Sequence, residues 1–129
     1  MIEVRKARLE DWVMIDQLGQ EVLGYEIDQA FSQSRLAAVL SKPANQLFVA
    51  FVSGEPAGYI HLQDYDVTYA IPYKNILGLA VFEHFQRQWV GQALIEAAED
   101  FARADGAGGI RLNSGEGRYG AHLFYEAAG

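Results

Sequence analysis

The sequence contains no cysteine, and only 10 of its 129 residues are lysine or arginine. The first absence excludes disulfide bonds and thiolate metal ligands, so thiol content gives no indication of the redox compartment. The second leaves a formal net charge of -7, and the few basic residues are scattered along the chain rather than clustered. We therefore expect no nucleic-acid partner, because binding a phosphate backbone requires gathered cations.

Long apolar runs are also missing. No uncharged stretch approaches the roughly 18 apolar residues that a membrane-spanning helix needs. The first residues carry charge from Glu3 onward and lack the apolar core of a signal peptide. Half of the residues are nevertheless apolar and 12% are aromatic, which indicates one packed domain over residues 1–129. We expect a cytoplasmic protein with no membrane partner.

Several catalytic motifs are absent too. The chain has neither a Walker loop nor a Gly-x-Ser-x-Gly elbow, so nucleotide hydrolysis and serine hydrolysis have no support. Its three histidines, His61, His84 and His122, show no spacing typical of a metal site. We expect no metal cofactor.

Periodicity predicts a mixed α/β fold in the order β-α-α-β-β-β-α-β-α. The predicted strands cover residues 2–7, 46–53, 57–69, 76–81 and 110–113. The predicted helices cover 11–23, the stretch from Asp28 to before Pro43, the stretch from the hinge at 86–91 to 104, and about 118–128. Turn residues at 54–56 indicate that the second and third strands form a hairpin.

The most informative stretch runs from Asn75 to Ala104, where an apolar strand passes through a polar hinge into an amphipathic helix. The first amides of a helix have no intrahelical partner and carry the positive end of the helix dipole. A strand that leads into such an end therefore predicts a phosphate-binding site at the hinge.

Three segments, taken in order, resemble the GNAT family of acetyl-CoA-dependent N-acetyltransferases. Leu79-Ala80-Val81 resembles the family's fourth strand, and the hinge with Gln92 to Ala98 resembles its pyrophosphate loop and third helix. The segment 118–129 resembles its final motif. The resemblance implies a twisted, mostly antiparallel sheet flanked by helices, with acetyl-CoA as cosubstrate and with the family's C-terminal strands missing.

The resemblance also implies which residues hold the cofactor. The strand amides would hold the pantetheine arm and polarise the thioester carbonyl, and the loop amides would bind the diphosphate. The implied cofactor-binding residues are Leu79, Ala80, Val81, Gln86, Arg87, Gln88, Trp89, Val90, Gly91 and Gln92.

The loop admits two alignments with the family's pattern Gln/Arg-x-x-Gly-x-Gly/Ala. If the pattern begins at Gln86, the helix keeps the family's apolar phase, but Trp89 occupies a glycine position. If it begins at Gln88, the letters fit, as Gln-Trp-Val-Gly-Gln-Ala. We favour Gln86, with the Trp89 indole turned outward or lying along the cofactor.

The implied reaction is direct attack of a primary amine on the thioester in a ternary complex. The leaving thiolate needs a proton, which the resemblance assigns to the Tyr125 phenol. An amine of pKa about 10 must first lose a proton. Glu83, Glu116 or a water molecule could accept it, and the sequence does not choose among them.

The acceptor is expected to be an amine of a small molecule or peptide. Acidic and aromatic residues could surround an ammonium group by charge and cation-π attraction. They are Tyr25, Glu26, Asp28, Phe31, Tyr65, Asp66, Tyr69 and Tyr73. Asn113, near the end of the fifth predicted strand, could orient the acceptor, and we assign Asn113 and Tyr73 to substrate binding.

The family normally continues past Gly129 into two more strands. Without them, the strand at 110–113 would have an uncovered edge, so we expect a second copy to pair there as a homodimer, or a longer natural chain. Two other functions stay open: a non-catalytic sensor that binds CoA or acyl-CoA, and an interaction domain without cofactor.

Overall fold

The computed structural model describes residues 1–24, 28–113 and 119–123. Its strands are β1 (Ile2–Lys6), β2 (Asn45–Val52), β3 (Glu55–Tyr65), β4 (Tyr73–Val81), β5 (Gly109–Asn113) and β6 (Tyr119–Leu123). Its α-helices are α1 (Trp12–Glu21), α2 (Gln29–Leu40) and α3 (Val90–Ala104). Two short 3-10 turns, η1 (Leu9–Asp11) and η2 (Glu83–Phe85), precede α1 and α3.

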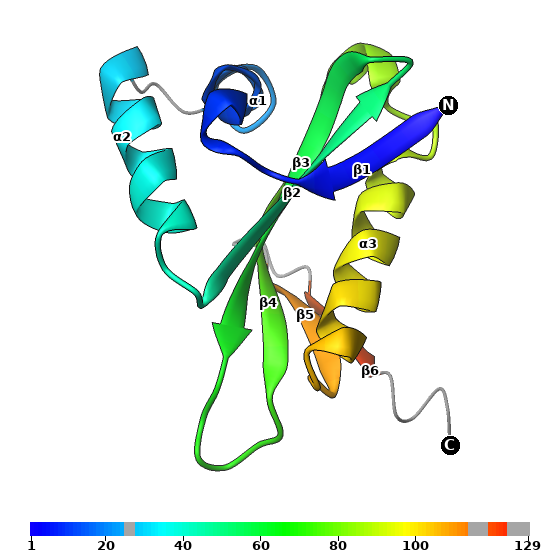
Figure 1. The fold of residues 1–129 in the computed structure, drawn as a ribbon. Helices are drawn as coiled ribbons and strands as arrows, with labels where there is room; N and C mark the ends of the chain where they lie inside the picture. Colours follow the sequence, from blue (N-terminus) through cyan, green and yellow to red (C-terminus); the bar gives the residue numbers. More distant parts are fainter. Residues whose placement is uncertain (25–27, 114–118, 124–129) are drawn as a thin grey trace.

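One sheet contains these six strands in chain order. Every neighbouring pair is antiparallel except β4 and β5, which are parallel because α3 connects them. Helices α1 and α2 cover one face of the sheet and α3 covers the other (Figure 1). The predicted mixed, mostly antiparallel fold is confirmed.

The face under α3 holds the main core. Leu94 and Ala98 of α3 are completely buried against Ile60 and Leu62 of β3, and the Phe48 ring meets Phe101 edge-on at 5.7 Å. This is the amphipathic helix that the sequence predicts. Its first turn is thereby fixed at the end of β4, where Val90 is also buried.

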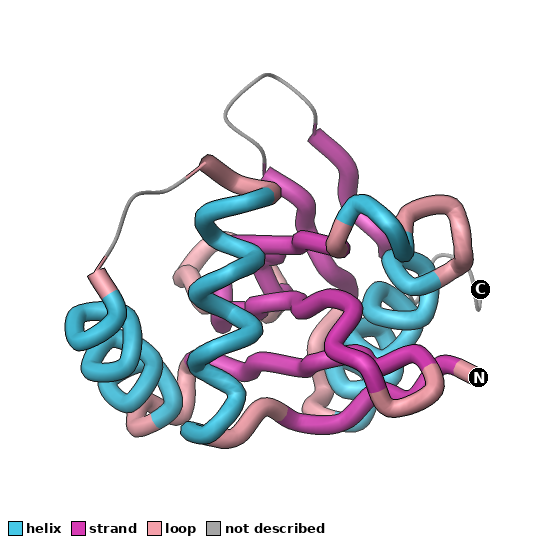
Figure 2. Tube along the Cα trace, turned by 90° about the horizontal axis from the view of Figure 1, so that it is seen from above, coloured by secondary structure: helices cyan, strands magenta, loops and turns pink. Residues whose placement is uncertain are grey.

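The opposite face carries α1 and α2. Figure 2 shows α1 lying across the strands, with α2 beside it. Met14 and Leu18 anchor α1 to the sheet. The predicted cap of α2 is confirmed, because the Asp28 carboxylate accepts a hydrogen bond from the Phe31 amide at 3.0 Å. A groove is left between the two helices, and β2 and β3 form its floor.

The hairpin of β2 and β3 is confirmed, but its turn is tighter than predicted. The turn consists of Ser53 and Gly54, both with positive φ, and β3 already begins at Glu55. Two left-handed residues match the twist of the strands that they join. At its other end β3 stops at Tyr65, short of the predicted residue 69.

The predicted last helix over 118–128 is wrong where the structure describes it. Residues 119–123 form β6, antiparallel to β5, with Asn113 opposite Tyr119. Gly120 disfavours a helix, and the pairing satisfies backbone groups along the outer edge of β5. The expectation that β5 has an uncovered edge is therefore also wrong, and a second copy cannot pair there.

None of the helices in residues 1–24, 28–113 and 119–123 combines the length and apolar character needed to cross a bilayer. Within the same ranges, no three His, Cys, Asp or Glu side chains gather as metal ligands would.

Candidate active site

The candidate site begins where β4 and β5 part. Along its other edge β4 pairs with β3 up to Val81, but β5 pairs with β4 only at Lys74, Asn75 and Ile76. Among the described residues, no strand runs along this edge of β4 beyond Ile76. The divergence opens the sheet at its centre, between α3 on one face and α1 and α2 on the other.

The open edge of β4 presents backbone amides. The Phe82 amide donates to the Ala57 carbonyl at 2.9 Å, so the backbone of Phe82 faces β3. Successive residues of a strand turn their backbone groups to opposite edges, so Leu79 and Val81 turn theirs away from β3. The Val81 carbonyl on that edge accepts a hydrogen bond from Gln86 Nε2 at 3.1 Å. The Leu79 and Val81 amides are therefore available to an extended ligand.

A close approach of β3 and β4 supports this edge. A Cβ atom at Gly58 would lie 2.6 Å from the Ala80 carbonyl oxygen and 3.3 Å from Leu94. Only glycine fits between β4 and α3 here. The β4 strand also has a bulge at Leu77, where the register with β3 shifts between His61 and Leu62. Such a bulge re-aims the residues that follow it.

The loop from β4 to α3 is compact and strained. Arg87 and Trp89 have φ values of 64° and 72°, in the left-handed region that glycine adopts most readily. The Gln88 side chain holds the loop by donating to the His84 carbonyl at 3.0 Å. The Trp89 indole projects outward and is 74% exposed.

The first turn of α3 offers unpaired amides to the same space. The first intrahelical bond runs from the Ala93 amide to the Trp89 carbonyl, so the amides of Val90, Gly91 and Gln92 precede it. No acidic residue lies in this turn, and no side chain caps it. Together with the positive end of the dipole, this end of α3 suits an anion such as a diphosphate.

A cavity of about 170 Å³ lies on the other face, between α1 and α2 and above β2 and β3. Its walls are largely apolar, from Trp12 and Ile15 of α1 to Leu36 of α2. Its floor carries Tyr59 and His61 of β3, and burial lowers the pKa of His61 below its usual 6.5. From the sequence, His61 is a candidate only for metal binding. The register of β3 with its neighbouring strands is what places the His61 side chain on the face of the sheet that α1 and α2 cover.

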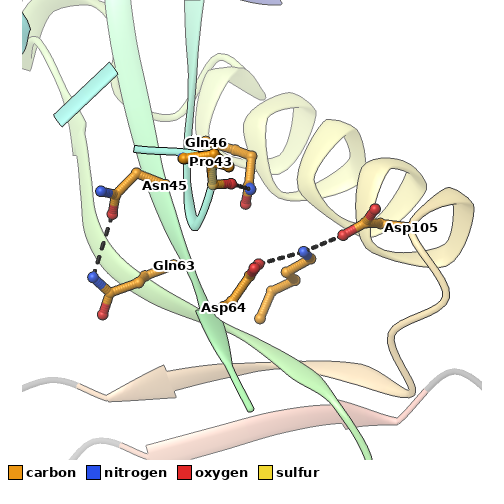
Figure 3. Close-up of polar contacts among 7 residues, drawn as sticks. Pro43, Asn45, Gln46, Gln63, Asp64 and Asp105 are labelled. Carbon is orange, nitrogen blue, oxygen red and sulfur yellow. Dashed lines mark hydrogen bonds and ion pairs between the residues drawn. The ribbon is translucent and has the colours of Figure 1, made fainter. Parts of the chain in front are cut away.

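A buried cation ties β3 and β4 to the end of α3 near the divergence. The Lys74 ammonium contacts Asp64 and Asp105, each at 2.5 Å, and lies over the Phe101 ring. Figure 3 shows Asp64 and Asp105 converging from β3 and from the end of α3. Burial would lower the Lys74 pKa, but the hydrogen bonds that the ammonium donates to both carboxylates raise it above its usual 10.5. This charge is structural, because its partners already surround it.

The residues expected to surround the acceptor do not gather in one place. Asp28 and Phe31 lie at the start of α2, and Tyr65 and Tyr73 pair at the far end of β3 and β4. The Tyr65 hydroxyl meets that of Tyr69 at 3.1 Å. Asn113 ends β5. Tyr25, Glu26, Glu116 and Tyr125 lie outside the described residues.

Comparisons with known proteins agree with this geometry. The model of the acetyltransferase (GNAT) family matches residues 4–129. A GNAT family acetyltransferase from Staphylococcus aureus has a TM-score of 0.79 at 21% identity, covering 89% of this chain and 87% of that one. Glucosamine-6-phosphate N-acetyltransferase from Arabidopsis thaliana gives 0.75 at 19%, covering 98% and 89%.

A third similar structure contains a ligand. AAC(6')-Iy, in complex with the bisubstrate analogue CoA-S-monomethyl-acetylneamine, gives a TM-score of 0.78 at 16% identity, covering 92% of this chain and 82% of that one. A search of curated proteins by sequence finds no match. The chain belongs to the GNAT acetyltransferase family, and the three similar structures named above are acetyltransferases.

Proposed function

We propose that the protein transfers an acetyl group from acetyl-CoA to a primary amine of a small molecule or peptide, by direct attack in a ternary complex. The observation that carries this proposal is the open edge of β4, which leads directly to the first turn of α3. A strand edge and a helix end in this order match a cofactor with an amide-containing arm and a diphosphate.

The chain's own groups fit acetyl-CoA at both ends. The Leu79 and Val81 amides would pair with the pantetheine arm, and one of them would donate to the thioester oxygen as negative charge develops there. The diphosphate would bind the amides of residues 89–92. The left-handed Trp89 occupies the position that is glycine in the family pattern when the pattern begins at Gln86, which favours that alignment.

In the proposed reaction, the amine loses a proton and attacks the thioester carbon. The new C–N bond forms, the C–S bond breaks, and the thiolate takes up a proton. We assign this last proton to Tyr125, whose phenol can protonate the sulfur. Asn113 and Tyr73 stay our candidates for acceptor binding, as predicted from the sequence.

Two measurements test the proposal. Calorimetric titration with acetyl-CoA and with acetyl-pantetheine, which lacks the diphosphate, should show markedly tighter binding of the former. A free-thiol assay over a panel of amines should then identify an acceptor. Tight binding without thiol release from any amine would instead indicate the non-catalytic sensor, and no binding at all would leave only an interaction domain.

The Tyr125→Phe variant tests the acid. It should lose turnover while it binds acetyl-CoA as the parent does. Unchanged turnover would remove Tyr125 from the mechanism.

Location and assembly are part of the proposal. We place the protein in the cytoplasm, where acetyl-CoA is available to it. A homodimer stays a prediction, to be checked by sedimentation, and its contact cannot be the edge of β5 that β6 occupies.

A further inference from the structure

One row of residues across the sheet runs from the floor of the cavity to β4, whose far edge is open. In the strand register, Leu47 of β2 lies opposite His61, and His61 lies opposite Gly78 of β4. These three residues share the face that α1 and α2 cover, because residues directly opposite one another point to the same side. His61 is therefore one strand away from the edge to which the thioester would bind.

Gly78 places no side chain of its own between the cavity and the open edge of β4. It carries no side chain, and the next residue on the same face of β4, Ala80, carries only a methyl group. A Cβ atom at Gly78 would lie 3.2 Å from the Tyr59 hydroxyl oxygen and 3.7 Å from Tyr59 Cζ, so the Tyr59 ring, rather than a β4 side chain, covers Gly78. An acceptor lying in the cavity would therefore approach β4 alongside the Tyr59 ring, which lines the cavity together with His61.

A hydrogen bond selects the tautomer of the neutral His61 ring. Its Nε2 lies 3.0 Å from Asn45 Oδ1, which also accepts from Gln63 Nε2 at 3.3 Å (Figure 3 shows the second bond). A carbonyl oxygen only accepts, so Nε2 carries the hydrogen and Nδ1 holds the lone pair. Asn45 is itself oriented by its Nδ2, which donates to the Val39 carbonyl at 3.4 Å. The ring therefore presents a proton acceptor.

The distances fit a transfer to this nitrogen. Opposite residues of antiparallel strands have Cβ atoms about 5 Å apart, and an imidazole extends a few ångströms beyond its Cβ. Because Nε2 is directed toward Asn45 of β2, the ring leans away from β4, and a nucleophile about 3 Å from a thioester on the far edge of β4 would reach Nδ1 through water.

We propose that His61 is the general base of the acetyl transfer: Nδ1 takes one proton from the ammonium group of an acceptor bound between α1 and α2. The amine then forms the C–N bond, the C–S bond breaks, the thiolate takes up a second proton, and the imidazolium returns its proton to water. This assignment rests on the proposed function and supplies the base that the sequence left open.

The surroundings of His61 favour a neutral ring. Asp16 of α1 lines the same cavity, but its carboxylate already accepts from Ser32 Oγ and Gln20 Nε2. Arg35 of α2 is the other charged group of the lining, and β2 contributes the neutral side chains of Asn45 and Leu47 beside the ring. From β4, Asn75 lies on this face, and its Oδ1 is buried without a hydrogen-bond partner among the described residues. That oxygen could accept an N–H of the acceptor.

The test compares two amines in His61→Gln, whose side-chain amide can still donate to Asn45. For an alkylamine of pKa about 10, we expect kcat to fall by about 10²–10⁴-fold. For an alkoxyamine, which is already neutral at the pH of the assay, the fall should be less than about 10-fold. Acetyl-CoA affinity, measured by calorimetry, should not change, and His84→Gln, an exposed histidine outside the cavity, serves as the matched control.

A second variant tests whether the pKa of His61 controls the rate. In Asn45→Asp, a carboxylate replaces the neutral partner of Nε2 and should raise the pKa of His61. The acidic limb of the kcat/KM profile should then move to higher pH, which a purely structural role of His61 would not produce.

The outcomes separate this assignment from the proposed function. An equal loss for both amines, or an unmoved acidic limb, would overturn His61 as the base while the transferase stands. A parent protein that binds acetyl-CoA but releases thiol with no amine would overturn both.

Discussion

The left-handed backbone at Trp89 leads to a stability prediction with an unusual sign. At most positions of a folded chain, alanine is more stabilising than glycine, because glycine loses more backbone freedom on folding, by about 0.5–1 kcal/mol. At φ of 72° an L-residue carries a steric cost of about 1–2 kcal/mol that glycine lacks. We therefore expect Trp89→Gly to be more stable than Trp89→Ala by about 0.5–1 kcal/mol.

The loss of the indole does not disturb this comparison. Trp89 is 74% exposed, so about a quarter of its surface is buried. For a tryptophan, that is about 50 Å², or about 1 kcal/mol of apolar burial. Both variants lose this contribution equally, so only the backbone difference between glycine and alanine remains.

Urea denaturation of the two variants measures the difference directly. In thermal unfolding it corresponds to roughly 2–5 °C in Tm for a domain of this size. An alanine variant as stable as the glycine variant would show that the strained loop conformation is absent in solution. The geometry proposed for the diphosphate site would then lose its basis, because that geometry places the loop amides with this backbone.

Three further predictions concern packing and charge. Gly58→Ala should lower the free energy of unfolding by about 1–3 kcal/mol in denaturant titrations, because the new Cβ would meet the Ala80 carbonyl oxygen. Gly91→Ala, whose Cβ would make only an ordinary contact at 3.9 Å, should be tolerated. Lys74→Met should lower the free energy of unfolding by about 2 kcal/mol in the same assay, because it removes the partner of two carboxylates. Lys6 also lies over the Phe101 ring, and Lys6→Met should lower the free energy of unfolding by less than about 0.5 kcal/mol. Folding lowers the pKa of His61, so as the pH falls the unfolded chain binds the proton before the folded chain does. The free energy of unfolding should therefore fall as the pH drops below 6.5, and His61→Gln should remove this contribution to the pH dependence.

Much of the fold could be predicted because its signals are local. The apolar period of α3, the Asp28 cap of α2 and the turn residues near Gly54 each act within a few residues. The last segment could not be predicted in the same way. Residues 119–123 pair with β5 across the sheet, and no short-range pattern records which strand needs a partner.

The residues of the candidate site likewise include some that local sequence predicts and some that depend on strand pairing. Loop and helix residues such as Trp89 and Gly91 follow one another in sequence, so their common location was predictable. His61 belongs to the site only because the bulge at Leu77 brings Gly78, rather than a residue with a side chain, opposite it. One residue of register shift would place a side chain between the cavity and the open edge of β4. The route from His61 to the thioester is thus a property of strand pairing, which a single sequence does not display.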